Sequence, residues 1–153
     1  MHVVEMRQIS KQFGDVVASD SVDFQLKRGE IHALLGENGA GKTTLMRILF
    51  GLYQEDRGEV LVDDQIVRIG SPKDAISLGI GMVTQHFALV PPFSVAENVI
   101  MGYRESLSLD MKAIQAEVAG SAAKFGIEID PAAIVRHLSV GQKQRVEILK
   151  ALF

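Results

Sequence analysis

The stretch "GENGAGKT", residues 36–43, constrains the fold of this chain more than any other part of its sequence. Gly36 and Gly41 are separated by four residues, Lys42 and Thr43 follow, and the apolar run "IHALLG" leads into the first glycine. Glycines let the backbone curl so that successive N–H groups point inward. A helix that starts near Lys42 adds the positive end of its dipole. The spacing therefore predicts a strand buried on both faces, a loop that cradles phosphate and then a helix, which is an α/β arrangement.

The side chains of this loop predict a site for a nucleotide and Mg²⁺. Lys42 can reach the β- and γ-phosphates, and the hydroxyl of Thr43 can ligate the metal ion. An ordinary glycine-rich turn between a strand and a helix is the alternative, but it explains neither the lysine and threonine nor the spacing. The residues expected to contact the nucleotide are Gly36, Glu37, Asn38, Gly39, Ala40, Gly41, Lys42, Thr43 and Thr44.

The part of the chain that precedes and follows this loop is rich in strand patterns. Residues 3–9 and 21–27 alternate between apolar and polar side chains, which predicts two strands, the second ending at a turn at residues 28 and 29. Residues 58–70 have the pattern of a hairpin with Asp63 and Asp64 near its turn. Residues 80–85 form a second apolar run that is expected to be a further strand.

Helix-start signals divide the remainder of the sequence. Ser71 with Asp74, and Ser94 with Glu97, have the spacing of capping boxes, and Pro72 suits the first position of a helix. With the apolar periodicity, these signals predict helices over 43–51, 71–79, 110–126 and 140–153, one beginning at Ser94 and a short one at Asp130 and Pro131.

Composition excludes several classes of protein. The net charge is −3, so nothing indicates a nucleic-acid binder held by bulk charge. The absence of cysteine excludes a disulfide framework and a thiolate metal site. No apolar run approaches the roughly 18 residues that cross a bilayer, and the N-terminus has no signal-peptide pattern. We therefore expect any link to a membrane to come through a partner.

Three further motifs give the chain a resemblance to a known family. "LSVGQ" at Leu138 to Gln142, followed by a basic helix, resembles the signature motif of ABC-type ATPases. "VTQHF" places Gln85 where that family has its Q-loop glutamine, and "KQFG" places Phe13 where it has an aromatic residue that stacks on adenine. Val140 stands where the commoner signature has glycine. This difference, together with the stretch 71–102, resembles the ATP-binding subunits of bacterial simple-sugar and nucleoside importers.

The resemblance implies a role for each matching residue. Lys42 and Gln85 would be catalytic, Thr43 and Gln85 would hold Mg²⁺, and Phe13 would bind the adenine of ATP. Ser139, Gly141 and Gln142 would bind the γ-phosphate. Each role has a structural alternative: Phe13 as a core residue, Gln85 as a surface amide and Ser139 as a helix cap only.

The four histidines do not match the switch histidine of the family. We expect His32, which lies in the apolar run before the loop, to be a core residue. His86 and His137 are interpreted as structural, and His2 as terminal.

The resemblance also implies a domain organisation. It predicts a P-loop NTPase core with an N-terminal antiparallel β subdomain, about 1–86, a helical subdomain, about 87–139, and the start of the signature helix at 140–153.

In the family, a strand bearing a Mg²⁺-binding aspartate and a catalytic glutamate follows that helix. The stretch "LVDD" at 61–64 resembles that aspartate-bearing strand, but it precedes the signature motif and lies in the predicted hairpin. We therefore expect a partial ABC ATPase domain, incomplete at the C-terminus and deficient in hydrolysis on its own.

The function implied is that of an ATP-binding subunit that couples ATP to import of a small solute such as a sugar or nucleoside. Its expected partners are a second such subunit, bound head to tail, transmembrane permease subunits and, indirectly, a solute-binding protein. The subunit itself is expected at the cytoplasmic face of the cell membrane, held there by the permease subunits. The alternatives are a truncated nucleotide-binding module without turnover and a soluble ABC protein acting on DNA or ribosomes. The near-neutral charge and the apolar segment 87–99 favour a transmembrane partner and no nucleic acid.

Overall fold

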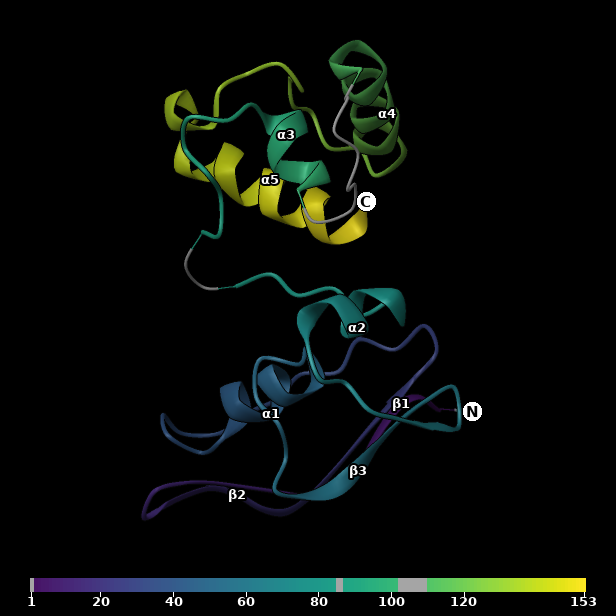
Figure 1. The fold of residues 1–153 in the computed structure, drawn as a ribbon, viewed down its shortest axis with the longest axis vertical. Helices are drawn as coiled ribbons and strands as arrows, with labels where there is room; N and C mark the ends of the chain where they lie inside the picture. Colours follow the sequence, from purple (N-terminus) through teal and green to yellow (C-terminus); the bar gives the residue numbers. More distant parts are fainter. Residues whose placement is uncertain (1, 85–86, 102–109) are drawn as a thin grey trace. The chain divides into compact units, whose positions relative to one another are not determined.

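The structure is a computed structural model that describes residues 2–84, 87–101 and 110–153 (Figure 1). The chain divides into two compact units, Met1–Ile80 and Gly81–Phe153. Within the described ranges, no helix combines the length and the apolar character that a membrane span requires.

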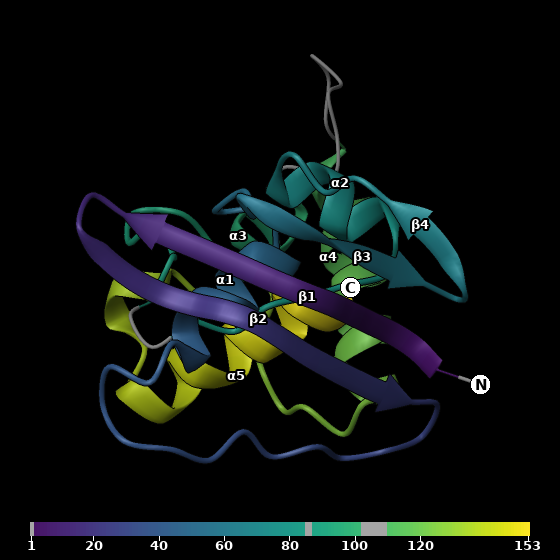
Figure 2. The same ribbon diagram turned by 90° about the horizontal axis from the view of Figure 1, so that it is seen from below.

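The first unit contains a four-stranded sheet with the order β2-β1-β3-β4. Its strands are β1 (His2–Phe13), β2 (Val16–Lys27), β3 (Arg57–Val62) and β4 (Gln65–Val67), and each neighbouring pair is antiparallel. Figure 2 shows β1 and β2 as two long adjacent strands. The predicted strands at 3–9 and 21–27 and the predicted antiparallel β region are therefore confirmed, and both strands extend further than their alternation indicated.

The turn between β3 and β4 has the geometry of a two-residue hairpin. Asp63 and Asp64 both adopt positive φ angles, 47° and 62°. Paired positive φ angles at the two central positions match the right-handed twist of the flanking strands, and aspartate tolerates them better than most residues. The predicted hairpin is confirmed.

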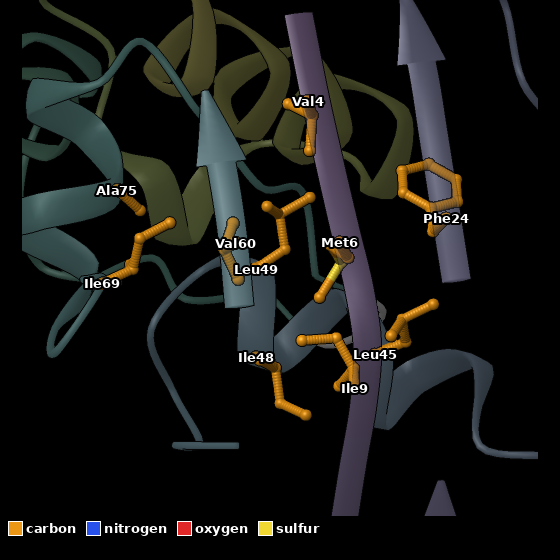
Figure 3. Close-up of a cluster of buried hydrophobic side chains, with 10 residues drawn as sticks. All are labelled: Val4, Met6, Ile9, Phe24, Leu45, Ile48, Leu49, Val60, Ile69 and Ala75. Carbon is orange, nitrogen blue, oxygen red and sulfur yellow. The ribbon is translucent and has the colours of Figure 1, made fainter. Parts of the chain in front are cut away.

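Two helices cover this unit: α1 (Lys42–Leu49), which follows the glycine-rich loop, and α2 (Pro72–Ser77), which Ser71 caps. Both were predicted. Apolar side chains of α1 pack against apolar side chains of β1 (Figure 3). Each fully buried side chain of this kind contributes about 1.5–3 kcal/mol. The buried core consists of Val4, Met6, Ile9, Phe24, Leu45, Ile48, Leu49, Val60, Ile69 and Ala75.

The apolar run before the loop does not form the strand that its composition predicted. Residues 31–35 have no regular secondary structure, and Ile31 is 100% exposed and Leu35 91% exposed. A strand requires a neighbour to accept its backbone hydrogen bonds, and the described sheet is built from β1–β4 alone. The prediction for His32 was also wrong, because its side chain is 36% exposed, although its ring makes an edge-to-face contact with the core residue Phe24.

The second unit is helical. It contains α3 (Val95–Ile100), α4 (Met111–Lys124), the 3-10 helix η1 (Val135–His137) and α5 (Val140–Leu152). Helix α3 packs against both α4 and α5. The shared core is formed by Val95, Ala96, Val99, Ile100, Ile114, Val118, Ala122, Val135, Val146 and Leu149.

Two predictions in this part of the chain were wrong. Residues 80–84 of the expected strand are irregular, again without a neighbouring strand to pair with. The short helix expected at Asp130 and Pro131 is a turn, and the helical hydrogen bonding begins only at Val135. The predicted capping box of α3, between Ser94 and Glu97, is present.

Candidate functional site

The glycine-rich loop passes directly against β2, and Gly41 makes that approach possible. Gly41 has a φ of 82°, in the left-handed region, and a Cβ at this position would overlap the carbonyl oxygen of Ala18. Any other residue would therefore suffer both backbone strain and a steric clash. The fold requires glycine here, in agreement with the spacing from which the loop was predicted.

The N-terminus of α1 differs from those of the other described α-helices. Side chains of Ser71, Ser94, Asp110 and Ser139 accept hydrogen bonds from first-turn N–H groups of α2 to α5. Helix α1 has Gly41 at this position and therefore no capping side chain. The first-turn N–H groups of a helix need acceptors and carry the positive end of the dipole. An uncapped end of this kind is suited to an anion such as phosphate.

Lys42 crosses the interior of the loop. Its ammonium donates hydrogen bonds to the carbonyl oxygens of Gly36 and Glu37, each at 2.7 Å. A Cβ on Gly36 would lie 3.8 Å from the same ammonium, so a side chain there would occupy the space beside the charge. The loop therefore holds the Lys42 ammonium in its centre, and the glycine at position 36 leaves one side of this ammonium free of side-chain atoms.

A pocket of about 280 Å³ opens beside the loop. One wall comes from Val16, Val17 and Ala18 of β2, and the other from residues 38–44. Val16 and Val17 are 66% and 61% exposed, which is unusual for two β-branched apolar residues in one strand. The pocket thus combines an apolar wall with the polar first turn of α1.

Phe13 lies next to this pocket, because it is the antiparallel partner of Val16 in the sheet. Phe13 is 42% exposed and lies outside the hydrophobic core. The alternative of a core role for Phe13 is therefore excluded by its position.

Charged groups fix the end of β1 near Phe13. Asp56 accepts hydrogen bonds from the ammonium of Lys11 and from the backbone N–H of Gln12, each at 2.7 Å. These two donors, the lysine first, hold the pKa of Asp56 below its usual value. The Lys11 ammonium is also 5.4 Å from the centroid of the Phe13 ring, within cation–π range.

The signature residues lie in the second unit, at the start of α5. Ser139 is the N-cap: its hydroxyl accepts from the N–H of Gln142 at 3.3 Å, and the Gln142 amide oxygen accepts from the N–H of Ser139 at 2.9 Å. Gly141 lies in the first turn, where an added Cβ would meet nothing within 4 Å outside the helix's own backbone. The cap role of Ser139 is thus present, on an exposed residue. Gln85 and His86 lie outside the described residues.

Two buried polar side chains hold the segment that follows Gln85, and sequence reasoning missed both. Asn98, fully buried, accepts from the N–H of Val90 at 2.7 Å and donates to the carbonyl oxygens of Val90 and Ser94. Glu147 of α5, 4% exposed, accepts from the N–H of Ala88. The sequence signal that could have identified these two residues is a polar side chain on a helix face that is otherwise apolar.

Comparison with known proteins decides the family. The ABC transporter family matches residues 19–153 of this chain. The chain belongs to the ABC transporter family. The resemblance on which the sequence prediction rested is therefore confirmed.

The curated relatives are named for nucleoside and sugar import. The nucleoside import ATP-binding protein NupA of Lactococcus lactis subsp. cremoris is 50% identical over 153 residues, 99% of this chain and 30% of that protein. The guanosine import ATP-binding protein NupO of Bacillus subtilis is 51% identical over 154 residues, with the same coverage. The ribose import ATP-binding protein RbsA 1 of Streptomyces avermitilis is 46% identical over 152 residues, covering 98% of this chain and 29% of that protein. The chain thus spans about 30% of the length of the curated relatives it matches.

Solved structures confirm the fold class. CbiO1 of Clostridium perfringens, part of the ABC transporter complex cbiONQ, is 29% identical with a TM-score of 0.77, and the match covers 99% of this chain and 61% of that chain. A nucleotide-free ATP-binding cassette from an ABC transporter has a TM-score of 0.84 at 23% identity, covering 99% of this chain and 65% of that one. This second likeness concerns the fold alone.

Proposed function

We propose that this chain binds ATP with Mg²⁺ and acts as an ATP-binding subunit in import of a small solute, such as a sugar or a nucleoside. The observation that carries the proposal is the uncapped N-terminus of α1, beside a loop whose centre is occupied by the Lys42 ammonium. Family membership and the names of the relatives support the importer role.

The phosphates of ATP would bind at residues 36–44. On binding, the ammonium of Lys42 would exchange its two carbonyl acceptors for phosphate oxygens, which form stronger, charge-assisted hydrogen bonds. The first-turn N–H groups of α1 would donate to the same anion. Thr43 is exposed at the start of α1 and offers a hydroxyl oxygen, a ligand type that Mg²⁺ prefers. The metal ion, when bound, would neutralise charge on the phosphates.

The adenine would lie against Phe13 and the apolar wall formed by Val16 and Val17. The exposed ring and the exposed β-branched side chains are adjacent in the sheet, so a flat base can cover both. Base–aromatic stacking contributes about 1–3 kcal/mol in nucleic-acid binders.

The signature residues Ser139, Gly141 and Gln142 would contact the γ-phosphate of ATP bound to a second subunit, in a head-to-tail dimer. Ser139 and Gly141 are exposed at the N-terminus of α5 and Gln142 is half-buried beside them, which leaves this end of the helix accessible for the contact. Gln85 would complete the Mg²⁺ site and position the attacking water, as the family resemblance implies.

Docking to transmembrane permease subunits would involve the segment 87–99. Its aromatic residues Phe87 and Phe93 are each 41% exposed, and the prolines at 91 and 92 between them are exposed too. This interaction would place the protein at the cytoplasmic face of the membrane. A solute-binding protein would act indirectly, through the permease, and no nucleic acid is involved.

We further propose that the 153-residue chain by itself turns over ATP slowly. Lys42 and Gln85 are the catalytic candidates within it, and no residue of this sequence corresponds to the aspartate and glutamate that follow the signature helix in the family. A missing general base lowers a rate by about 10²–10⁴-fold. A steady-state phosphate-release assay separates this proposal from full turnover, with Lys42→Ala as the control for contaminating ATPase.

Titration with a fluorescent ATP analogue tests the binding proposal. Lys42→Ala should lose most of the affinity, because it removes the cation at the centre of the loop. Lys112→Ala removes the same charge from the exposed face of α4 and should leave the affinity unchanged. Equal affinity in a folded Lys42→Ala variant and in the original chain would contradict the proposal.

A further inference from the structure

The ring of Phe13 has a specific aromatic neighbour, Tyr53. The two ring centroids are 5.0 Å apart and the planes are inclined at 69°, an edge-to-face arrangement. Such pairs are favourable beyond the area that they bury, because the positive edge of one ring meets the negative face of the other. The pair joins the end of β1 to the segment that follows α1.

Tyr53 is itself fixed to the C-terminal turn of α1. The guanidinium of Arg47 donates to the Tyr53 hydroxyl at 3.0 Å and lies 5.6 Å from the centroid of its ring. The backbone N–H of Tyr53 donates to the carbonyl oxygen of Arg47 at 3.3 Å. The side chain also packs against the hydrophobic core of the first unit. The orientation of the Tyr53 ring is therefore set by the helix.

Phe13 needs an orienting contact of this kind. It is the last residue of β1, and a turn with Gly14 in the left-handed region follows it. A half-exposed side chain at the end of a hairpin retains several rotamers, and restricting them lowers the entropy lost when a ligand binds. The edge-to-face contact with Tyr53 restricts the Phe13 ring before any base arrives.

We propose that Tyr53 is a positioning residue for the base of the nucleotide, acting through Phe13 and held in place by Arg47. Helix α1 then sets both ends of the ligand: its N-terminus receives the phosphates, and its C-terminal turn, through Tyr53, orients the ring on which the base stacks. This inference rests on the proposed function, because it requires that ATP occupies the pocket beside β2.

Calorimetric titrations with Mg²⁺·ATP and with inorganic tripolyphosphate separate the contribution of the nucleoside to the binding affinity from that of the phosphates. Tyr53→Leu keeps apolar bulk against the core and removes the ring, and should weaken ATP binding about two- to tenfold while tripolyphosphate binding is unchanged. Tyr53→Phe keeps the edge-to-face contact and should bind ATP within about twofold of the original chain. The same Tyr53→Leu change in a Phe13→Leu background should have no further effect on ATP, because the contact through which it acts is already absent.

Leu52→Ala is the matched control: this neighbour is 46% exposed, and its truncation should alter neither titration. If Tyr53→Leu does not fold, Arg47→Ala at the exposed face of α1 replaces it, with a smaller loss for ATP alone expected. Unchanged ATP affinity in the folded variant, or equal weakening of ATP and tripolyphosphate, would overturn the inference. Failure of the proposed function has a different signature, because Lys42→Ala would then leave both titrations unaltered.

Discussion

At the scale of single residues, the spacing of the glycine, lysine and threonine residues predicted the loop at residues 36–43, but it could not predict the side-chain contact between Phe13 and Tyr53. Gly36, Gly41, Lys42 and Thr43 were identified from sequence because their spacing is demanded by one local geometry, a backbone that curls around an anion. The contact between Tyr53 and Phe13 was not predictable, because it joins the end of β1 to the segment after α1, which is distant in the sequence.

Gly41→Ala is expected to abolish phosphate binding. The new methyl group would overlap the carbonyl oxygen of Ala18, and alanine is strained at a φ of 82°. The loop must therefore move away from β2, and its N–H groups and Lys42 move with it. Titration with inorganic tripolyphosphate measures the loss.

Gly120→Ala in α4 is the control for that substitution. Gly120 is exposed, and a Cβ there meets nothing within 4 Å. It should stabilise the chain by about 0.5–1 kcal/mol, because alanine loses less conformational entropy in a helix interior. A Gly41→Ala variant that binds tripolyphosphate as tightly as the Gly120→Ala variant would contradict the assigned geometry.

At the scale of elements, caps and turns were the most predictable features. The capping box at Ser94 and the hairpin turn at Asp63 and Asp64 each depend on a few adjacent residues, so local sequence suffices. The predicted capping box at Ser71 is formed only in part, because Ser71 caps α2 but the carboxylate of Asp74 accepts from the N–H of Gly70 and from the Ser71 hydroxyl. The two apolar runs, 31–35 and 80–84, were wrongly predicted as strands. An isolated strand has no intrinsic hydrogen-bonding partner, and the presence of one is a property of the fold rather than of the run.

The capping box of α3 should make the stability of the chain pH-dependent. The Ser94 hydroxyl and the Ser94 N–H donate to Glu97 and lower its pKa below the usual 4.5. A depressed pKa in the folded state means that this stabilisation is complete above about pH 4.5 and is lost as the pH falls through the folded-state value.

Glu97→Gln retains an acceptor oxygen but cannot titrate, so it isolates this contribution. Thermal melts from about pH 7 down to about pH 3 should show the original chain more stable at neutral pH, with the difference from Glu97→Gln shrinking on acidification. A difference that stays constant or grows as the pH falls would be inconsistent with the capping geometry.

Asn98 should prove essential for the order of the segment before α3. Asn98→Ala leaves the N–H of Val90 without its acceptor, at a cost of about 1–3 kcal/mol when this group stays buried, whereas the carbonyl oxygen of Val90 keeps the N–H of Phe93 as a donor. Hydrogen exchange should accelerate at the Val90 amide and stay slow at Val118 in α4. Slow exchange at Val90 in the variant would show that other groups hold the segment.

At the scale of the whole molecule, the chain consists of two units, each with its own hydrophobic core. The α/β class, the antiparallel sheet and the helical part were predictable, because they follow from periodicity and from the family resemblance. The exposure of Ile31 and Leu35 in the irregular stretch 31–35 was not predictable, since the apolar composition of this stretch suggests burial.

Ile31→Lys should therefore be tolerated. Ile31 is 100% exposed, and substitutions at surface positions change the free energy of unfolding by about 0.5 kcal/mol or less. The added charge should also lower aggregation, because it interrupts an exposed apolar run. Light scattering and denaturant unfolding measure both effects. A destabilisation well above about 1 kcal/mol would mean that Ile31 is buried in solution.

An amide chemical-shift titration would show whether the first turn of α1 and its loop hold the phosphates of a nucleotide. Mg²⁺·ATP and tripolyphosphate should both shift the amides of Gly41, Thr43 and Thr44, whereas adenosine should shift residues near Phe13 and Val16 and leave the loop unchanged. Equal shifts of the loop amides with adenosine, or no shift there at saturating Mg²⁺·ATP, would contradict phosphate binding at this loop.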